Sequence, residues 1–348
     1  MSLKYTLSKK ILHFKQPAGT SRGVYTTRKI WLVHLSEGEK TGVGECAPLP
    51  DLSCDALPDE TYEAKLHQFC QTLCQTGELD DESLRPYPSM RFGLETAVLS
   101  LQSSLHSSLS TLLLFDTPFS RGEEGIPING LVWMGNYDEM LQRMEEKLEK
   151  GFRCVKLKIG AIDFDQELDL VKRIRDRFSF HEVELRLDAN GAFKYEDALY
   201  KLELLSQYAI HSIEQPIRQG QWAYMAELCR ESPLPIALDE ELIGVNDPEM
   251  KGHMLNVIKP RYIILKPSLH GGMKGCREWI EAARQQGIGS WITSALESNI
   301  GLNAIAQFAS DVYGPHIRMP QGLGTGQLFT DNIPMPLTII KDRILIKT

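Results

Sequence analysis

The chain has 348 residues, which is long enough for two domains and a large buried core. Its net charge of −8 argues against a nucleic-acid partner, because binding to phosphates needs a basic face. No segment approaches the ~20 apolar residues of a membrane helix, and the N-terminus does not have the pattern of a signal peptide. We therefore expect neither a membrane protein nor a secreted one.

The cysteines agree with that expectation. There are seven of them, an odd number, and none form a CxxC pair. A disulfide framework or a zinc knuckle is therefore not expected, and free thiols in a reducing compartment are. The sequence predicts a cytoplasmic protein.

The first third of the chain has an α+β pattern. Residues 4–48 are β-prone, with a polar turn at 37–40, and residues 59–77 and 88–116 are predicted to be helices. In the second helix the apolar positions recur at helical spacing: Phe92, Leu94, Ala97, Val98, Leu101 and Leu105. We predict a capping domain over 1–122, with a linker near 118–125.

From residue 126 strands alternate with helices, which predicts a parallel sheet. A first strand at 127–132 is followed by a helix with Asn136 as its N-cap, Glu139 three residues on, and Gly151 just past its end. A second helix is expected at 165–178, a seventh strand at 289–295 and a weaker eighth near 316–319. Eight strands over ~200 residues favour a closed α/β barrel, here 123–325. The β-prone tail, 326–348, is expected to return to the capping domain.

Charged residues end five successive strands of this pattern. They are Lys158, Asp188, Glu214, Asp239 and Lys266, at intervals of 30, 26, 25 and 27 residues. A barrel of parallel strands directs the residues at its carboxyl ends into one mouth. We therefore expect the five side chains to meet there.

Three carboxylates at one mouth would repel each other strongly unless a cation lay between them. All-oxygen ligands suit Mg²⁺, so we predict that Asp188, Glu214 and Asp239 bind it. Glu240, which directly follows Asp239, is expected to support the site.

Lys156 and Lys158 are two residues apart on one strand, so their side chains share a face. Neighbouring positive charge would favour the neutral form of a lysine and lower its pKa toward the ~7–8 of lysine bases. Lys266 would enter from the other side of the barrel. Two lysines facing a carboxylate held by Mg²⁺ suit removal of the α proton, with the enediolate stabilised by the metal.

Each of these signals has an ordinary explanation when taken alone. A KxK pair is usually a solvated strand face, an Asp at a strand end is usually a helix N-cap, and a lysine before a proline can simply end a strand. Their joint occurrence, in order and at barrel spacing, favours the catalytic interpretation.

This arrangement resembles the enolase superfamily, in the muconate-cycloisomerase-like subgroup with two barrel lysines. The matching segments are Lys156-Leu157-Lys158, Asp188-Ala189-Asn190-Gly191, Glu214-Gln215-Pro216, Asp239-Glu240, Lys266-Pro267-Ser268 and, in the capping domain, Gly42-Val43-Gly44-Glu45-Cys46-Ala47-Pro48. The resemblance covers nearly the whole chain. It implies a modified TIM barrel, (β/α)7β, with an α+β capping domain formed by the N-terminal region and the C-terminal tail.

Two further segments resemble the o-succinylbenzoate synthase family: residues 294–302, reading SALESNIGL, and residues 321–325, reading QGLGT. The resemblance implies a Mg²⁺-dependent dehydration of 2-succinyl-6-hydroxy-2,4-cyclohexadiene-1-carboxylate in menaquinone biosynthesis. Lys158 would take the α proton and return it to the leaving hydroxyl. Lys266 would stay charged and stabilise the planar intermediate, and Lys156 would tune Lys158.

Further residues are expected to bind the small carboxylate substrate. The loop at 18–23, with Arg22, and the loop at 49–53 are candidates for closing over the mouth. The alternative for both loops is an ordinary surface loop. For Asn129 the alternative is a polar role in the core. The full predicted set is Arg22, Leu49, Asn129, Asn190, Ser294, Glu297 and Gly322.

Two alternatives remain open at this stage. An N-acylamino acid racemase, or another epimerase of the same superfamily, would also use two opposed lysines. A dipeptide epimerase is disfavoured because the expected Asp-x-Asp near the eighth strand is missing. A barrel that binds without turnover would lack a ligand or a base, and none is lacking. The oligomeric state is left open.

Overall fold

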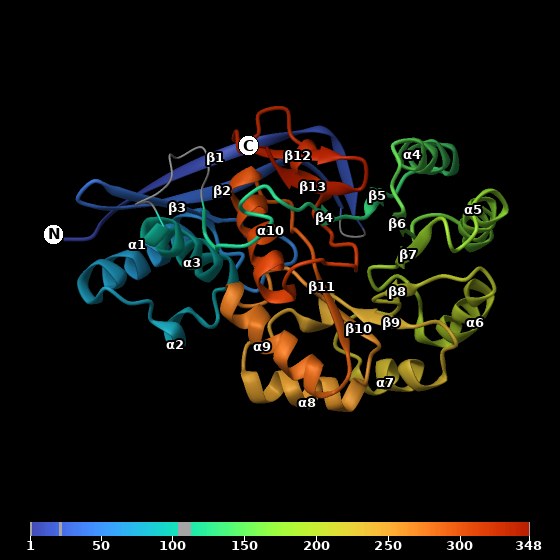
Figure 1. Ribbon diagram of the computed structural model, residues 1–348. Coiled ribbons are helices and arrows are strands. Elements are labelled where there is room, and N and C mark those ends of the chain that lie inside the picture. Colours follow the sequence, from blue (N-terminus) through green and yellow to red (C-terminus); the bar gives the residue numbers. More distant parts are fainter. Residues whose placement is uncertain (1, 21–22, 104–112, 348) are drawn as a thin grey trace.

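The computed structural model describes residues 2–20, 23–103 and 113–347. Its N-terminal part is an antiparallel sheet, in the order β1-β2-β3, with helices packed against one face (Figure 1). The strands are β1 (Lys4–Thr20), β2 (Gly23–Glu37) and β3 (Lys40–Cys46), and the helices are α1 (Asp59–Thr76), α2 (Asp81–Leu84) and α3 (Pro88–Ser103). The predicted turn at 37–40 joins β2 to β3, with Glu37 paired to Lys40.

Helix α3 and strand β3 approach each other unusually closely, because glycines remove the side chains between them. A Cβ atom on Gly44 would lie 1.8 Å from the carbonyl oxygen of Gly93. The buried face of α3 includes Phe92, Leu94, Ala97 and Leu101, as its spacing predicts. The described part of α3 reaches Ser103, and a helix to 116 was expected. Of that remainder, 104–112 lie outside the described residues, and residues 113–116 are not helical.

The C-terminal part is a parallel sheet of seven strands in chain order, β5 to β11, with the connecting helices outside it (Figure 1). The strands are β5 (Gly130–Val132), β6 (Cys154–Lys158), β7 (Glu184–Asp188), β8 (Ser212–Glu214), β9 (Ile236–Leu238), β10 (Tyr262–Leu265) and β11 (Gly289–Ile292). The helices are α4 (Tyr137–Glu149), α5 (Phe164–Arg177), α6 (Tyr195–Ser206), α7 (Trp222–Glu231), α8 (Pro248–Ile258), α9 (Gly272–Gln285) and α10 (Asn299–Tyr313), with short 3₁₀ turns η1 (Glu240–Leu242) and η2 (Gly324–Gln327). The capping box predicted at Asn136 and Glu139 is present.

Two residues close the barrel in place of a full eighth strand. Gly322 bridges Thr293 after β11, and Gln321 bridges Ile128 before β5, both in parallel. The expected strand at 316–319 does not form. His316 adopts a left-handed φ of 63°, and Pro320, just after this segment, has no N–H to donate to a neighbouring strand.

The C-terminal tail contacts both parts of the molecule. The backbone N–H of Lys15 donates to the carbonyl of Leu328, at 2.8 Å, and that of Thr330 donates to His13, at 2.9 Å. The hairpin of β12 (Leu337–Ile340) and β13 (Arg343–Ile346) then pairs with β4 (Ile126–Pro127) at the start of the barrel. The predicted first strand is therefore split, and its first half pairs with the tail. We keep 1–122, 123–325 and 326–348 as proposed domain limits.

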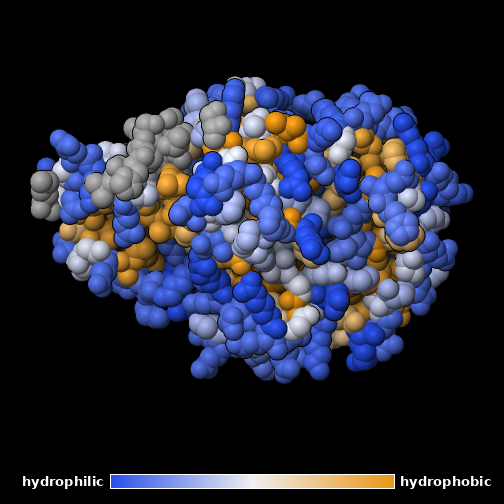
Figure 2. Space-filling model, viewed as in Figure 1, coloured by the Kyte–Doolittle hydropathy of each residue, from blue (hydrophilic) through white to orange (hydrophobic). Residues whose placement is uncertain are grey.

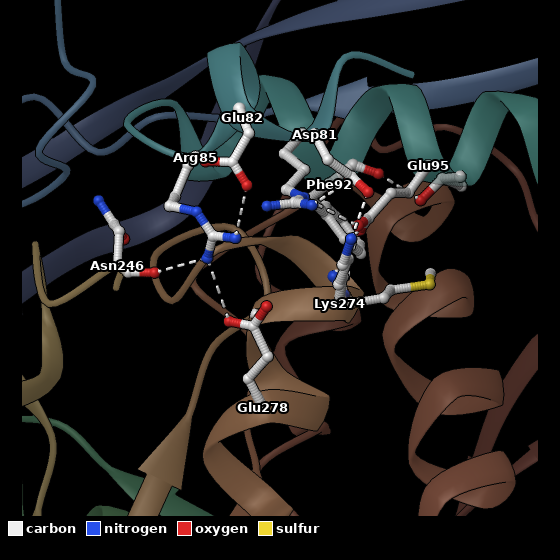
Figure 3. Close-up of polar contacts among 12 residues, drawn as sticks. Asp81, Glu82, Arg85, Phe92, Glu95, Asn246, Lys274 and Glu278 are labelled. Atoms are coloured by element: carbon white, nitrogen blue, oxygen red, sulfur yellow. Dashed lines mark hydrogen bonds and ion pairs between the residues drawn. The ribbon is translucent and has the colours of Figure 1, made fainter. Parts of the chain in front are cut away.

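The capping helices also dock on the barrel through a network of charged side chains, shown in Figure 3. Arg85 donates to the carbonyl of Asn246 at 3.0 Å and lies 3.5 Å from Glu278 of α9. The buried Arg91 pairs with Asp81 and, at 3.2 Å, with Glu95. We call this set the interface network: Asp81, Glu82, Arg85, Arg91, Glu95, Lys274 and Glu278.

Polar side chains cover most of the face seen in Figure 2, and apolar residues reach it in separate patches. Among the helices described, none is long and apolar enough to cross a membrane.

Candidate active site

The five strand-end residues lie at the carboxyl edge of the sheet, as their spacing predicts. Lys158 ends β6 and pairs in register with Asp188 at the end of β7, which pairs in turn with Glu214 at the end of β8. Asp239 directly follows β9 and Lys266 directly follows β10. Because adjacent parallel strands are in register, their terminal side chains are brought to one level.

Ion pairs connect these side chains across the mouth. The Nζ atom of Lys156 lies 2.8 Å from Oδ2 of Asp188 and 2.6 Å from Oε2 of Glu214. Lys158 Nζ is 3.1 Å from the same Asp188 oxygen, and Lys266 pairs with Asp239. Each of the three lysines therefore forms an ion pair with at least one of the three carboxylates.

Burial and charge oppose each other in setting the pKa values of these groups. Burial lowers the pKa of Lys156, but Asp188 and Glu214 outweigh it and raise the pKa above its usual value. Burial likewise lowers the pKa of Lys266, but the charge of Asp239 outweighs it and the pKa is raised. Both lysines are therefore ammonium ions at neutral pH.

The carboxylates divide in the same way. Burial acts to raise the pKa of Asp188, yet Lys156 and Lys158 lower it below its usual range. Burial also acts to raise the pKa of Asp239, but Lys266 lowers this pKa below its usual value. The pKa of Glu214 is raised, by burial first and then by the charge of Asp188. Lys156, 2.6 Å away, acts to lower it but does not offset burial and Asp188.

Amide side chains fix the positions of the charged groups. Asn190 accepts from Lys158 Nζ at 2.7 Å and donates to Glu240 at 3.0 Å. Gln215 accepts from the backbone N–H of Asp239 at 3.3 Å and donates to Glu241 at 3.0 Å. Both amides have left-handed backbone conformations, φ 44° and 40°, which are strained positions typical of functional sites.

The carboxylate oxygens at the mouth are of the chemical type that binds a divalent cation. Oε1 of Glu214 and Oδ1 of Asp239 are buried and accept no hydrogen bond from the described residues. Buried acceptors in folded proteins normally have a partner, and a hard cation bound by carboxylate oxygens would be one. Within the described ranges, no three His, Cys, Asp or Glu side chains are arranged so that they could hold a metal ion. The Lys156 ammonium lies between Asp188 and Glu214.

A cavity of about 350 Å³ opens above these residues, within the range of small-molecule sites. Of the charged set, Lys156, Lys158, Asp188 and Lys266 line it, and Glu214 and Asp239 do not. Five predicted substrate-binding residues also line the cavity: Leu49, Asn129, Asn190, Ser294 and Gly322.

The other two predicted substrate-binding residues differ. Glu297 is fully buried behind the cavity wall, where it accepts from Ser268 Oγ at 2.5 Å and from the backbone N–H of Ala295 at 2.6 Å. It therefore supports the wall and does not line it. Arg22 lies outside the described residues.

The sequence reasoning missed most of the apolar lining. Phe14 and Pro17 of β1, together with Leu52, Trp133 and Leu328, line the cavity. The ring of Trp133 lies 5.8 Å from Lys158 Nζ, within cation–π range. Trp133 directly follows β5 and could have been found as an aromatic residue at a strand end, whereas Phe14 comes from a distant hairpin and left no local signal.

The comparisons with known proteins agree with this fold and this site. A family model described as enolase C-terminal domain-like matches residues 139–336, and one described as the MenC N-terminal domain matches residues 19–101. The chain therefore belongs to the enolase superfamily. Enzymes of this superfamily are generally dependent on a divalent metal, and a similar structure from Enterococcus faecalis, a dipeptide epimerase, was solved with Mg and a dipeptide.

The particular family follows from the most similar relatives. The chain is 46% identical to the o-succinylbenzoate synthase of Desulfotalea psychrophila, with 97% of each chain covered. The crystal structure of MenC from the same organism superposes with a TM-score of 0.82 at 41% identity, covering 99% of this chain and 100% of that one. The o-succinylbenzoate synthase of Yersinia enterocolitica is 29% identical over 80% of this chain and 77% of its own. Within the superfamily, the chain belongs with the o-succinylbenzoate synthases.

Proposed function

We infer that the protein is an o-succinylbenzoate synthase, a carbon–oxygen lyase of menaquinone biosynthesis. It removes water from 2-succinyl-6-hydroxy-2,4-cyclohexadiene-1-carboxylate to give o-succinylbenzoate. The observation that carries this inference is a cavity lined by Lys158, Lys266 and Asp188 in a chain 46% identical to a synthase. The alternative racemase function has less support, since an epimerase relative is only 23% identical.

We propose that Asp188, Glu214 and Asp239 hold one Mg²⁺ ion. The support is their burial at three neighbouring strand ends and the unpartnered oxygens of Glu214 and Asp239. When bound, the ion would hold the substrate carboxylate and offset the negative charge that grows on it as the α proton leaves.

We propose Lys158 as the general base. Its Nζ lies in the cavity, between Asn190 and Asp188 and beside the Trp133 ring. A lysine acts as a base only in its neutral amine form. The neutral amine then takes the α proton, the ring C–H electron pair moves into the ring, and the C–O bond to the hydroxyl breaks. Lys158 returns the proton to that oxygen, so one water leaves and the ring becomes aromatic.

Lys266 reaches the cavity from β10, several strands away from Lys158. Its ammonium is held by Asp239, and the His270 Nδ1 atom accepts from its backbone N–H at 2.8 Å. Burial lowers the pKa of His270 to about 3, so this imidazole is neutral. We propose that Lys266 stays charged and stabilises the planar, electron-rich ring through its π face.

The test is an ultraviolet assay for dehydration of the cyclohexadiene substrate, with and without Mg²⁺, on wild type and Lys158→Ala. The proposal expects turnover that needs both the ion and Lys158. If the wild type binds Mg²⁺ but shows no dehydration, the substrate assignment fails while the superfamily chemistry stands.

The racemase alternative has a separate test, because Lys158 and Lys266 reach the cavity from the ends of different strands. If the protein is a racemase, incubation with N-succinyl amino acids in D₂O will exchange the α proton of both enantiomers for deuterium. Exchange without dehydration would replace the proposed function.

We also propose a cytoplasmic location and a small-molecule carboxylate as the sole substrate class. All seven cysteines are free thiols, which suits a reducing compartment. A cell fractionation experiment tests the location.

A further inference from the structure

One buried arginine joins the capping sheet to two loops at the cavity. Arg28 of β2 is 3% exposed. Its guanidinium donates to the carbonyls of Ala47 and Pro48, which precede the loop at 49–53, and to those of Leu296, at 3.1 Å, and Ala295, at 3.4 Å. The first pair belongs to the capping region and the second to the loop after β11.

The arginine is used here as a multiple donor and not as an ion-pair partner. A guanidinium has five N–H donors in a rigid plane and no acceptor. Within the described ranges, no carboxylate forms an ion pair with Arg28, although Glu45 and Glu297 lie near enough to favour its charge. Hydrogen bonds from a charged donor are stronger than those from a neutral one. Besides the carbonyl of its neighbour Lys29, at 3.5 Å, Arg28 holds those of four residues from two distant segments.

The side chains next to these carbonyls form the apolar wall of the cavity. Leu49 and Leu296 line it and belong to one buried cluster with Ala295 and Leu269. Leu296 has a left-handed φ of 66°, a strained conformation for a branched side chain. Its backbone is held there by Arg28 and by Ser294, whose Oγ accepts from the Leu296 N–H at 3.2 Å.

We propose that Arg28 is a positioning residue that sets the apolar wall of the substrate cavity, by fixing Leu49 and Leu296 against each other from two separate segments. It acts on binding of the non-reacting part of the substrate and leaves the lysines and carboxylates in place. This inference rests on the proposed function, since its test uses that substrate and product.

The experiment compares Arg28→Gln and Arg28→Lys with the same changes at Arg85. Arg85 is a matched control, because it too joins a capping element to barrel backbone, at Asn246 (Figure 3). It belongs to the interface network and does not line the cavity. The readouts are KM, kcat, the dissociation constant of o-succinylbenzoate by calorimetry, and Tm.

For Arg28→Gln we expect KM and the product dissociation constant to rise about tenfold, with kcat within about threefold of wild type. Arg28→Lys should recover part of the loss, because an ammonium reaches fewer carbonyls than a guanidinium. The Arg85 variants should lower Tm with KM unchanged. Equal KM effects at Arg28 and Arg85, or an Arg28→Gln change in Tm alone, would overturn the proposal.

A double-mutant cycle covers the case in which Arg28→Gln does not fold. If Arg28 acts through the wall, then Arg28→Lys should add little to the KM of a Leu296→Ala variant. Strictly additive effects would also overturn the proposal. A wild-type protein that neither turns over the substrate nor binds the product would instead refute the proposed function.

Discussion

The barrel mouth and the interface network are both clusters of lysine or arginine with carboxylates, yet they differ in how completely the charges are paired. At the interface, Arg91 is buried between Asp81 and Glu95, and Arg85 lies between Glu82 and Glu278. At the mouth, buried oxygens of Glu214 and Asp239 lack hydrogen bonds from the described residues. A cavity opens over the mouth cluster, and no residue of the interface network lines that cavity. Incomplete pairing beside a cavity distinguishes a reactive site from a structural one better than charge density does.

The largest expected effect is at the proposed base. Lys158→Ala should lower kcat by about 10³-fold or more, because removal of general base catalysis alone costs 10²–10⁴. The measurement is the ultraviolet dehydration assay. Lys274→Ala in the interface network is the matched control and should keep wild-type kcat. Equal losses in both variants would erase the distinction between the two clusters.

Glu214→Gln should separate metal binding from stability. Loss of one carboxylate ligand is expected to weaken Mg²⁺ binding at least tenfold by calorimetry, and dehydration should fall with it. Without Mg²⁺, the variant should be more stable than metal-free wild type. The reason is that burial and the charge of Asp188 both disfavour the ionised form of Glu214 and raise its pKa. A Tm below wild type without Mg²⁺ would contradict this expectation. Glu278→Gln serves as the interface control and should leave Mg²⁺ binding unchanged.

In the interface network the effect should be on stability alone. Arg91→Met leaves Glu95 without its buried partner, which should cost ~3–5 kcal/mol in the free energy of unfolding. The variant should retain wild-type KM wherever it is folded. Urea denaturation gives the first quantity and the dehydration assay the second. A raised KM would show that the interface network reaches the site.

The last expected effect is confined to the pH dependence of stability and concerns Asp55, a carboxylate that differs from both clusters. Its Oδ1 atom has no hydrogen-bond partner among the described residues, yet it lines no part of the cavity. Burial raises its pKa to about 6, against hydrogen bonds from Ser89. The folded protein therefore holds this proton more tightly than the unfolded chain does. The resulting stability is present below pH ~4 and is lost as pH rises through about 6, by ~3 kcal/mol at most.

Asp55→Asn should flatten the dependence of unfolding free energy on pH between about 4 and 6, measured by urea denaturation. An unchanged slope would mean that another group carries it. The dehydration rate of the variant should match that of wild type, because Asp55 does not line the cavity.

Much of the site could be predicted from the sequence because the chemistry follows the repeat of the barrel. Strand ends recur at nearly equal intervals, so Lys158, Asp188 and Glu214 could be placed together without any contact information. The Mg²⁺ assignment and the roles of the lysines stay predictions. The two long capping helices, α1 and α3, and the β2–β3 turn could also be predicted, because each depends on local spacing or on turn residues.

What could not be predicted depends on contacts between distant segments. No local signal indicates that Leu49 and Leu296 share one wall, or that Arg28 holds both. The motif at 294–302 predicts Glu297 as a substrate-binding residue, but its oxygens accept hydrogen bonds from Ser268 and Ala295. The eighth strand was misplaced because two bridging residues are too short to give a strand pattern.

The two-residue closure has a consequence for synthesis of the protein. Until Gln321 and Gly322 leave the ribosome, the parallel sheet has two unpaired edges, at β5 and β11. Open edges of apolar strands are templates for pairing with other chains. The nascent barrel is therefore exposed to aggregation for almost its whole translation, and a truncation before residue 321 would keep it in that state permanently.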